Sequence, residues 1–532
     1  MKKIINYLLI NLLFGANYKN KIIKSHKILK QDTKRVEYLI NNLKEEIENY
    51  LQTKREKNSS IYDLCLSQFI FKNLINNKYF NEKLILEICN LNKFYYPLPT
   101  EYLKIIKNKG FEVNFLLSKI MWISLIFIHS IYNLLSIITL LFFTPKNNLQ
   151  EKDNTIIFLD AIPNINPNDI QNELPDFYNW FANFFLKEKS VNKSIIFVHN
   201  NKNIKDISIK CKNTFSYQII YNKNFLLRNL KIYKYFVAVK RSLFLILKKD
   251  LKKILILKEI FFYKYVELEE NCKPDYALFN MSNMTLKPLW SSIKNKNNDP
   301  IDYLYYYSTN IVPLVEKPET APNVFGYRIQ NWSNYIFWNE KHKNWIEKCS
   351  KRKINSIIVN NYIPFEGKNI SIIKNEKKKI IIFDIPPRND FVYYNLMHVG
   401  NIYSYEYCSK FFDDVVSSIK DTFKSAEILY KIKRDISSIN LDYKKKFLNA
   451  ESKIDGFKIF YDEVSAQSLI KACDASISIP FTSTALIADY LKKPSIYYHP
   501  GNELLKSSFS EKENNLINIR SDLEKWLKKV CI

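Results

Sequence analysis

The residues best suited to chemistry lie in the segment SISIPFTSTALIADYLKKPSIYY, residues 476–498. Its first apolar run predicts a buried strand ending at Ile479, and a helix follows. Backbone N–H groups at a helix start behind a parallel strand favour a bound anion such as phosphate. Ordinary N-capping by Ser or Thr is the alternative, although three successive hydroxyls exceed what one cap requires. The candidate anion-binding residues are Pro480, Phe481, Thr482, Ser483 and Thr484.

Basic side chains follow two other predicted strands. They are Arg388, after the strand 379–384, and Lys431, Lys433 and Arg434, after the strand 426–430. The carboxyl ends of parallel strands meet at one edge of a sheet, so we expect these cations to face the hydroxyl segment and neutralise a diphosphate. Solvated surface charge in a lysine-rich chain is the alternative. Arginine is the more informative residue, because the chain has only nine and its fork matches phosphate geometry.

Acidic residues and a histidine end further predicted strands. Asp462 and Glu463 lie in a loop placed to meet a nucleobase or ribose, while Ser465 as a simple helix cap is the competing interpretation. Asp160 ends the first strand in the middle of the chain and is the best general-base candidate. A structural turn aspartate is the alternative. His199, also at a strand end, is the second catalytic candidate.

Two sheets are needed to position these residues. Apolar runs alternate with helical stretches from residue 155 onward, and a second alternation begins near residue 354. This pattern predicts an α/β protein with two doubly wound, Rossmann-like domains, residues 151–345 and 346–532, that enclose a cleft. Ser308, Thr309 and Asn310 follow a strand of the first domain and are expected to line that cleft.

The N-terminal part of the chain is predicted to be helical. In residues 1–112, apolar side chains recur at every fourth position, as at Leu39, Leu43, Ile47 and Leu51. The opening MKKIINYLLINLL has the same character, and we expect a helix with one apolar face there rather than a cleaved signal peptide.

Residues 113–150 contain the strongest membrane candidate. Met121–Phe143 is free of formal charge and long enough to span a hydrocarbon layer of about 30 Å. His129, Asn133 and several serines oppose spanning. A membrane-embedded or in-plane helix and a buried core helix both remain open.

The amino-acid composition favours some binding partners and excludes several kinds of binding site. The chain of 532 residues has 80 Lys and Arg against 53 Asp and Glu, a net charge of +27. This charge favours a phosphate-rich or anionic membrane partner, and the chain carries no nucleic-acid-binding signature. Seven glycines exclude a glycine-rich phosphate loop. The eight cysteines form no C-x-x-C pair and the six histidines are scattered, so we expect a reducing compartment and no metal site.

The segment PFTSTALIADYLKKPSIYY resembles the hallmark of the bacterial polysaccharide biosynthesis PFTS-motif proteins. The wider order, with K-x-K-R, ACDASISIP and KKPSIYY across residues 375–500, is similar to GT-B glycosyltransferases. The resemblance implies a C-terminal domain that holds a nucleotide-sugar donor and an N-terminal domain that receives a lipid-linked or glycan acceptor. It also implies catalysis without a bound metal or other cofactor.

The sequence therefore predicts a glycosyltransferase of surface polysaccharide (capsule or O-antigen) assembly at the cytoplasmic face of the inner membrane. The predicted residues for holding the donor diphosphate are Ser483, Thr484, Lys433 and Arg434, assisted by Arg388. Asp160 would deprotonate the acceptor if the enzyme inverts. The rival hypotheses are a nucleotide-sugar 2-epimerase or polyol-phosphate transferase of the same fold, and a non-catalytic membrane-docked subunit.

Overall fold

The computed structural model describes part of the chain. The described residues are 20–21, 24–25, 28, 33–57, 61–140, 155–159, 180, 193–199, 207–210, 215–221, 240, 244, 251–256, 276–280, 301–306, 308, 314–315, 326–330, 332–364, 377–387, 404–433, 439–461, 464–480, 482–501, 505–506 and 516–530.

The N-terminal region is helical, as the four-residue spacing predicts. Its elements are α3 (Thr33–Lys57), α4 (Ile61–Phe69), the π-helix η1 (Ile70–Ile75), α5 (Lys78–Ile88), α6 (Thr100–Asn108) and α7 (Phe115–Leu140). Leu43, Ile47 and Leu51 of α3 are buried in one core with residues of the other helices. The long apolar helix begins at Phe115, six residues before the predicted Met121, and the predicted residues 141–143 lie outside the described part.

The first sheet is doubly wound, with the strand order β3-β4-β2-β1-β5-β6-β8-β9. Its strands are β1 (Thr155–Leu159), β2 (Lys193–His199), β3 (Ile207–Lys210), β4 (Phe215–Tyr221), β5 (Tyr276–Asn280), β6 (Ile301–Tyr305), β8 (Asn334–Phe337) and β9 (Ser356–Ile358). All neighbours are parallel except β3 and β4. Because β9 pairs with β8, this sheet continues past the predicted domain boundary at 345–346.

The second sheet is parallel throughout, in the order β12-β11-β10-β13-β14-β16. Its strands are β10 (Lys379–Phe383), β11 (Glu427–Lys431), β12 (Phe457–Phe460), β13 (Ala475–Ser478), β14 (Ser495–Tyr498) and β16 (Leu516–Ile517). The chain starts in the middle, winds to one edge, and returns to wind to the other. Together the two sheets confirm the predicted pair of Rossmann-like units.

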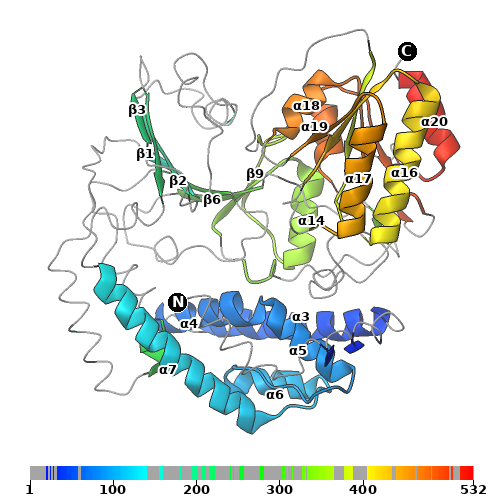
Figure 1. Cartoon of the computed structure of the whole chain (residues 1–532). Helices are drawn as coiled ribbons and strands as arrows, with labels where there is room; N and C mark the ends of the chain where they lie inside the picture. The colour runs from blue at the N-terminus through cyan, green and yellow to red at the C-terminus, as the bar shows by residue number, and fades with distance from the viewer. Residues whose placement is uncertain are drawn as a thin grey trace.

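Helices cover both faces of the second sheet (Figure 1). One face carries α16 (Tyr405–Thr422), α17 (Leu441–Lys453) and α20 (Arg520–Val530), and the other carries α18 (Ala466–Ala472) and α19 (Thr484–Tyr490). Strand β10 serves both cores, since Ile380 and Ile382 pack with the first set and Ile381 and Phe383 with the second. A parallel strand covered on both sides requires such a continuous apolar run.

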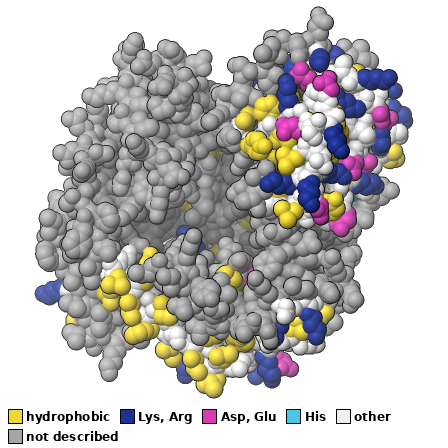
Figure 2. Space-filling model, viewed as in Figure 1, with side chains coloured by type: hydrophobic (Ala, Val, Ile, Leu, Met, Phe, Trp, Pro, Cys, Tyr) yellow, Lys and Arg dark blue, Asp and Glu magenta, His cyan; other side chains and the backbone are white. Residues whose placement is uncertain are grey.

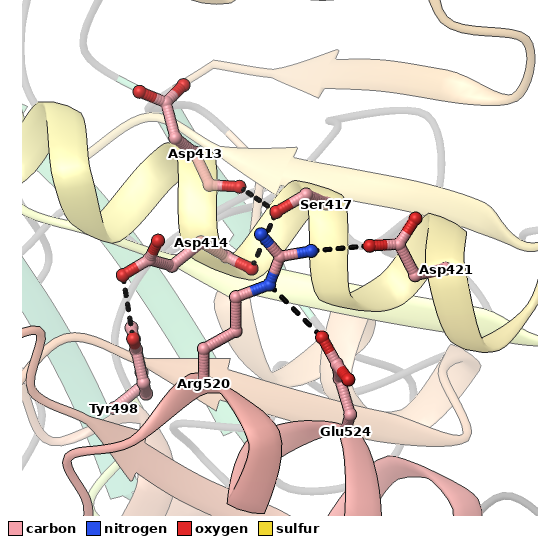
Figure 3. A network of polar contacts seen from close by, with 7 residues as sticks. All are labelled: Asp413, Asp414, Ser417, Asp421, Tyr498, Arg520 and Glu524. Atoms are coloured by element: carbon pink, nitrogen blue, oxygen red, sulfur yellow. Dashed lines mark hydrogen bonds and ion pairs between the residues drawn. The ribbon is translucent and has the colours of Figure 1, made fainter.

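Arg520, at the start of α20, connects this last helix to α16 on the same face of the second sheet (Figure 3). Its guanidinium pairs with Asp421 of α16 and with Glu524 one turn further along α20, the latter at 3.1 Å from Nε. On the same face of α16, the Tyr498 hydroxyl at the end of β14 donates to Asp414 at 2.7 Å. These contacts fix α16 and α20 to the outer half of the second sheet.

The two sheets share a hydrophobic core. Leu278 and Tyr305 of the first sheet and Trp338, directly after β8, lie in one cluster with residues of β10, α18 and α19. Helix α14 (Glu340–Ser350) follows Trp338, whose indole N–H donates to the Tyr306 carbonyl at 2.7 Å. Smaller elements are α11 (Leu251–Leu255) and the antiparallel pair β7 (Leu314–Val315) and β15 (Leu505–Lys506).

Candidate functional site

The candidate site lies where the carboxyl ends of β10 and β13 meet. Phe383 at the end of β10 is in register with Ser478 at the end of β13, and the Ile479 N–H donates to the Phe383 carbonyl at 2.8 Å. The connections leave these two neighbouring strands toward opposite edges of the sheet. Such a switch point is where open α/β sheets bind ligands.

The hydroxyls that follow β13 are bonded to one another and to the backbone. Thr482 Oγ1 donates to the Ile479 carbonyl at 2.9 Å, and Thr484 Oγ1 lies 2.8 Å from Ser478 Oγ and 3.1 Å from Thr482 Oγ1. The Tyr497 hydroxyl donates to the Thr482 carbonyl at 2.6 Å. Two of the three hydroxyls therefore hold the turn that starts α19, and Thr482 is buried together with Pro480.

Ser483 differs from its neighbours. It is the N-cap residue of α19, yet its side chain makes no capping hydrogen bond. Its hydroxyl instead lies 2.7 Å from that of Ser308, which follows β6 of the first sheet. The carboxyl edges of the two sheets thus meet at Ser483, and Ser308 lies at the junction where the sequence predicts it.

The two described lysines at the end of β11 differ in exposure. Lys431 is buried, and its ammonium donates to the carbonyls of Ile432 at 3.1 Å and Tyr461 at 2.7 Å. This side chain ties the end of β11 to that of β12. Lys433 is exposed two residues further on.

The remaining predicted site residues are not described in full. Arg388, Arg434, Asp462, Glu463, Phe481 and Asp160 lie outside the described residues. The backbone of His199 is described as the last residue of β2, in register with Tyr221 of β4. Asp160 is the residue directly after β1, which pairs with β2 on one side and β5 on the other. The end of β1 is therefore the switch point of the first sheet.

A buried carboxylate also lies at the second sheet's switch point. Asp384 directly follows β10 and is 1% exposed, and its Oδ2 accepts hydrogen bonds from the hydroxyls of Tyr430 and Tyr443. Burial, followed by the charge of Asp384, raises the pKa of both phenols well above the ordinary value. In the sequence, the available signal for Asp384 is a carboxyl group that ends an apolar strand, which is equally typical of a turn residue.

A histidine and a tyrosine meet beside the neighbouring strand. His499 directly follows β14 and is 2% exposed, and its Nδ1 lies 2.7 Å from the hydroxyl of Tyr407 in the first turn of α16. From the sequence, His499 is a candidate phosphate contact, because it directly follows a predicted strand. The available signal was a histidine directly after an apolar strand, but nothing in the sequence connects it to Tyr407.

This geometry defines the class as a two-sheet, doubly wound α/β protein whose sheets meet at their carboxyl edges. The family model described as "Polysaccharide biosynthesis PFTS motif protein" matches residues 241–527. The match covers more than half of the chain, so the protein belongs to this family, and the predicted membership is confirmed. A sequence comparison with curated proteins gave no match.

Several solved structures resemble the chain in part. Trehalose-6-phosphate synthase from E. coli with UDP-2-fluoro glucose is 8% identical, covers 71% of this chain and 91% of its own, and has a TM-score of 0.36. The Burkholderia multivorans synthase is 7% identical, covers 71% of this chain and 91% of its own, and has a TM-score of 0.38. The wall teichoic acid polymerase TagF is 11% identical, covers 76% of this chain and 88% of its own, and has a TM-score of 0.38.

Proposed function

We propose that the protein is a glycosyltransferase of bacterial surface polysaccharide (capsule or O-antigen) assembly. It transfers a sugar from a nucleotide-sugar donor to a lipid-linked or glycan acceptor. The observation that supports this best is the 2.7 Å contact between Ser308 and Ser483, which brings the carboxyl edges of both sheets together at the PFTS segment. A reaction that joins a nucleotide-bound group to a second substrate needs two binding edges that face one site.

The donor belongs, in this proposal, to the second unit, residues 346–532. Ser483, Thr484, Lys433 and Arg434 hold the diphosphate, with Arg388 assisting, and Asp462 and Glu463 meet the base or ribose. Cations and N–H groups placed around a departing diphosphate stabilise the charge that develops as the glycosidic bond breaks. Ser483 lies at the start of α19, where its hydroxyl contacts Ser308 of the other unit and does not cap its own helix.

The acceptor belongs to the first unit, residues 151–345. Asp160 directly follows β1 at the switch point of that sheet, and His199 ends the adjacent β2. A carboxylate there is suited to accept the proton of an acceptor hydroxyl during attack on the sugar. The enzyme works at the cytoplasmic face of the inner membrane, where a lipid-linked acceptor would be presented.

The test is nucleotide binding. We expect one of the UDP-, GDP- or CMP-sugars to bind in a calorimetric titration and to raise the melting temperature. The double variant Ser483→Ala with Arg434→Ala is expected to fold and to lose affinity by at least about 100-fold, since two hydrogen bonds to a charged group together contribute about 3 kcal/mol or more.

Ser308→Ala is the matched control, because it removes the same Ser308–Ser483 hydrogen bond without altering the PFTS segment. It should keep the wild-type affinity within about threefold. Unchanged binding by the double variant would contradict the assigned site. A wild-type protein that binds none of these nucleotides would instead support the non-catalytic subunit.

A further inference from the structure

Helix α7 has two apolar faces, and only one of them is covered. Met121, Trp122, Leu125 and Ile126 are buried in the N-terminal core. On the opposite face, six large apolar side chains recur at intervals of three or four residues and are 44–72% exposed. They form what we call the α7 stripe: Leu116, Ile120, Ile123, Phe127, Ile131 and Leu135. Figure 2 shows a run of hydrophobic side chains at the lower left, where α7 lies in Figure 1.

The covered face is anchored by polar contacts along the helix. Ser118 accepts a hydrogen bond from the backbone N–H of Tyr96 at 3.1 Å. Asn133 donates to the Leu255 carbonyl of α11, and His129 packs edge-on against Phe69 of α4 at 5.4 Å. These contacts span more than four helical turns, so the orientation of α7 on its neighbours is set.

This packing argues against a spanning helix. Residues Phe115–Ser136 have the length and apolar composition to cross a membrane, and they are the sole such stretch among the described residues. A helix that spans must face lipid or other spanning segments around its whole circumference. Here one side packs on α6 and α11, which carry the exposed lysines Lys104, Lys107 and Lys252. An apolar stripe on an otherwise anchored helix suits the plane of a membrane surface.

The charged residues near the stripe indicate that the membrane surface it would meet is anionic. Lys119 is exposed on α7 within the N-terminal part of the stripe, and α7 itself contains no acidic residue. The stripe consists of five aliphatic side chains and one phenylalanine, without the tyrosine and arginine that enrich protein interfaces. Lysines beside an aliphatic stripe complement anionic headgroups above acyl chains.

We propose that α7 docks the protein in the plane of an anionic lipid bilayer, with the α7 stripe among the acyl chains and the exposed Lys119 at the headgroups, together with Lys107, whose ammonium lies 5.9 Å from the Phe115 ring at the start of α7. This deepens the membrane association in the proposed function by naming its surface and orientation. Docking depends on lipid chemistry alone and requires no nucleotide or acceptor.

Vesicle flotation with the full chain tests the proposal. We expect the protein to float with vesicles of phosphatidylcholine containing roughly one third phosphatidylglycerol, and more weakly with phosphatidylcholine alone. The double variant Ile123→Ser with Phe127→Ser should bind about 100-fold more weakly, roughly tenfold for each side chain withdrawn from hydrocarbon. Lys119→Glu should weaken binding to the anionic vesicles only.

Leu441→Ser with Ile519→Ser is the matched control, because these side chains are 71% and 58% exposed on other elements. It should float like the wild type. Absence of flotation by the wild type, equal loss in the control, or a wild-type dimer that the stripe variant converts to monomer without any lipid binding would each overturn the proposal.

Extraction distinguishes in-plane docking from spanning. Carbonate at pH 11 should release the membrane-bound wild type, and retention in the membrane would overturn the in-plane orientation. Nucleotide binding by the stripe variant should match the wild type, so a failure of docking and a failure of the proposed transferase site give different results.

Discussion

Glu48 places a carboxyl group inside the contact between α3 and residues 326–330. Its Oε1 accepts a hydrogen bond from the Gly326 N–H, and Lys44, Glu45 and Arg328 are the charged groups around it. Burial raises the pKa of Glu48 to about 7, and burial lowers the pKa of Lys44 to about 8. At neutral pH both groups therefore lie close to a change of charge.

Glu48→Gln should remove part of the protein's pH dependence of stability. In the wild type the unfolded carboxyl ionises near pH 4.5 while the folded one keeps its proton to about pH 7. The stabilisation is therefore complete below pH 4.5 and is lost as the pH rises to 7, by at most about 3 kcal/mol. Lys44 stays protonated over that window.

Urea unfolding at pH 5 and pH 7.5 measures the effect. The glutamine variant should lose less stability than the wild type between these two pH values. Glu46→Gln, on an exposed residue of the same helix that pairs with Lys109, is the control and should follow the wild type. A glutamine variant with an unchanged pH slope would show that Glu48 ionises normally.

At the scale of elements, Asp384 links three segments of the second unit. The carboxylate follows β10, Tyr430 lies in β11 and Tyr443 lies in the first turn of α17. Both hydroxyls donate to the same oxygen inside a core of aromatic side chains. Helix α17 is thereby fixed to the strand that precedes the candidate donor site.

Tyr443→Phe should destabilise the protein by about 1.5–3 kcal/mol, because the buried carboxylate loses a hydrogen bond that no solvent replaces. Chemical denaturation measures the loss. Tyr461→Phe, on a side chain that is 41% exposed, is the matched control and should change stability by less than about 0.5 kcal/mol. Equal effects from the two variants would show that the Asp384 contact contributes nothing specific.

At the scale of the whole molecule, the shared core joins the two sheets. Trp338 is fully buried in a cluster that also contains Ile381 and Phe383 of β10 and Ile487 of α19. The junction that carries the Ser308–Ser483 contact therefore rests on a common hydrophobic base. We expect the two sheets to unfold together rather than as independent units.

Trp338→Ala should lower the free energy of unfolding by about 3–5 kcal/mol, the usual cost of emptying a large core site. Calorimetry should show one transition that involves both sheets in the wild type. Two well-separated transitions, with only one of them shifted by the variant, would contradict the shared core. Trp526→Ala, on the partly buried side of α20, serves as the comparison and should cost less.

Much of the architecture could be predicted because parallel strands covered on both faces need uninterrupted apolar runs. Runs such as Ile380–Phe383 and Ile428–Tyr430 therefore mark the central strands by composition alone. The short edge strand β9 was not predicted, since its three residues are only half-buried and carry no comparable run. Its place in the first sheet depends on pairing with β8.

The sequence by itself determined the fold class, the family and the segment around Ser483, because these depend on local patterns: apolar runs, turn residues and a short motif. Only the tertiary structure shows that Ser483 contacts Ser308 and that the Lys431 ammonium donates to backbone carbonyls. It also decides which face of α7 is exposed. Apolar and hydroxyl side chains look the same in a sequence whatever surrounds them, and only packing brings distant segments together and shows what each side chain touches.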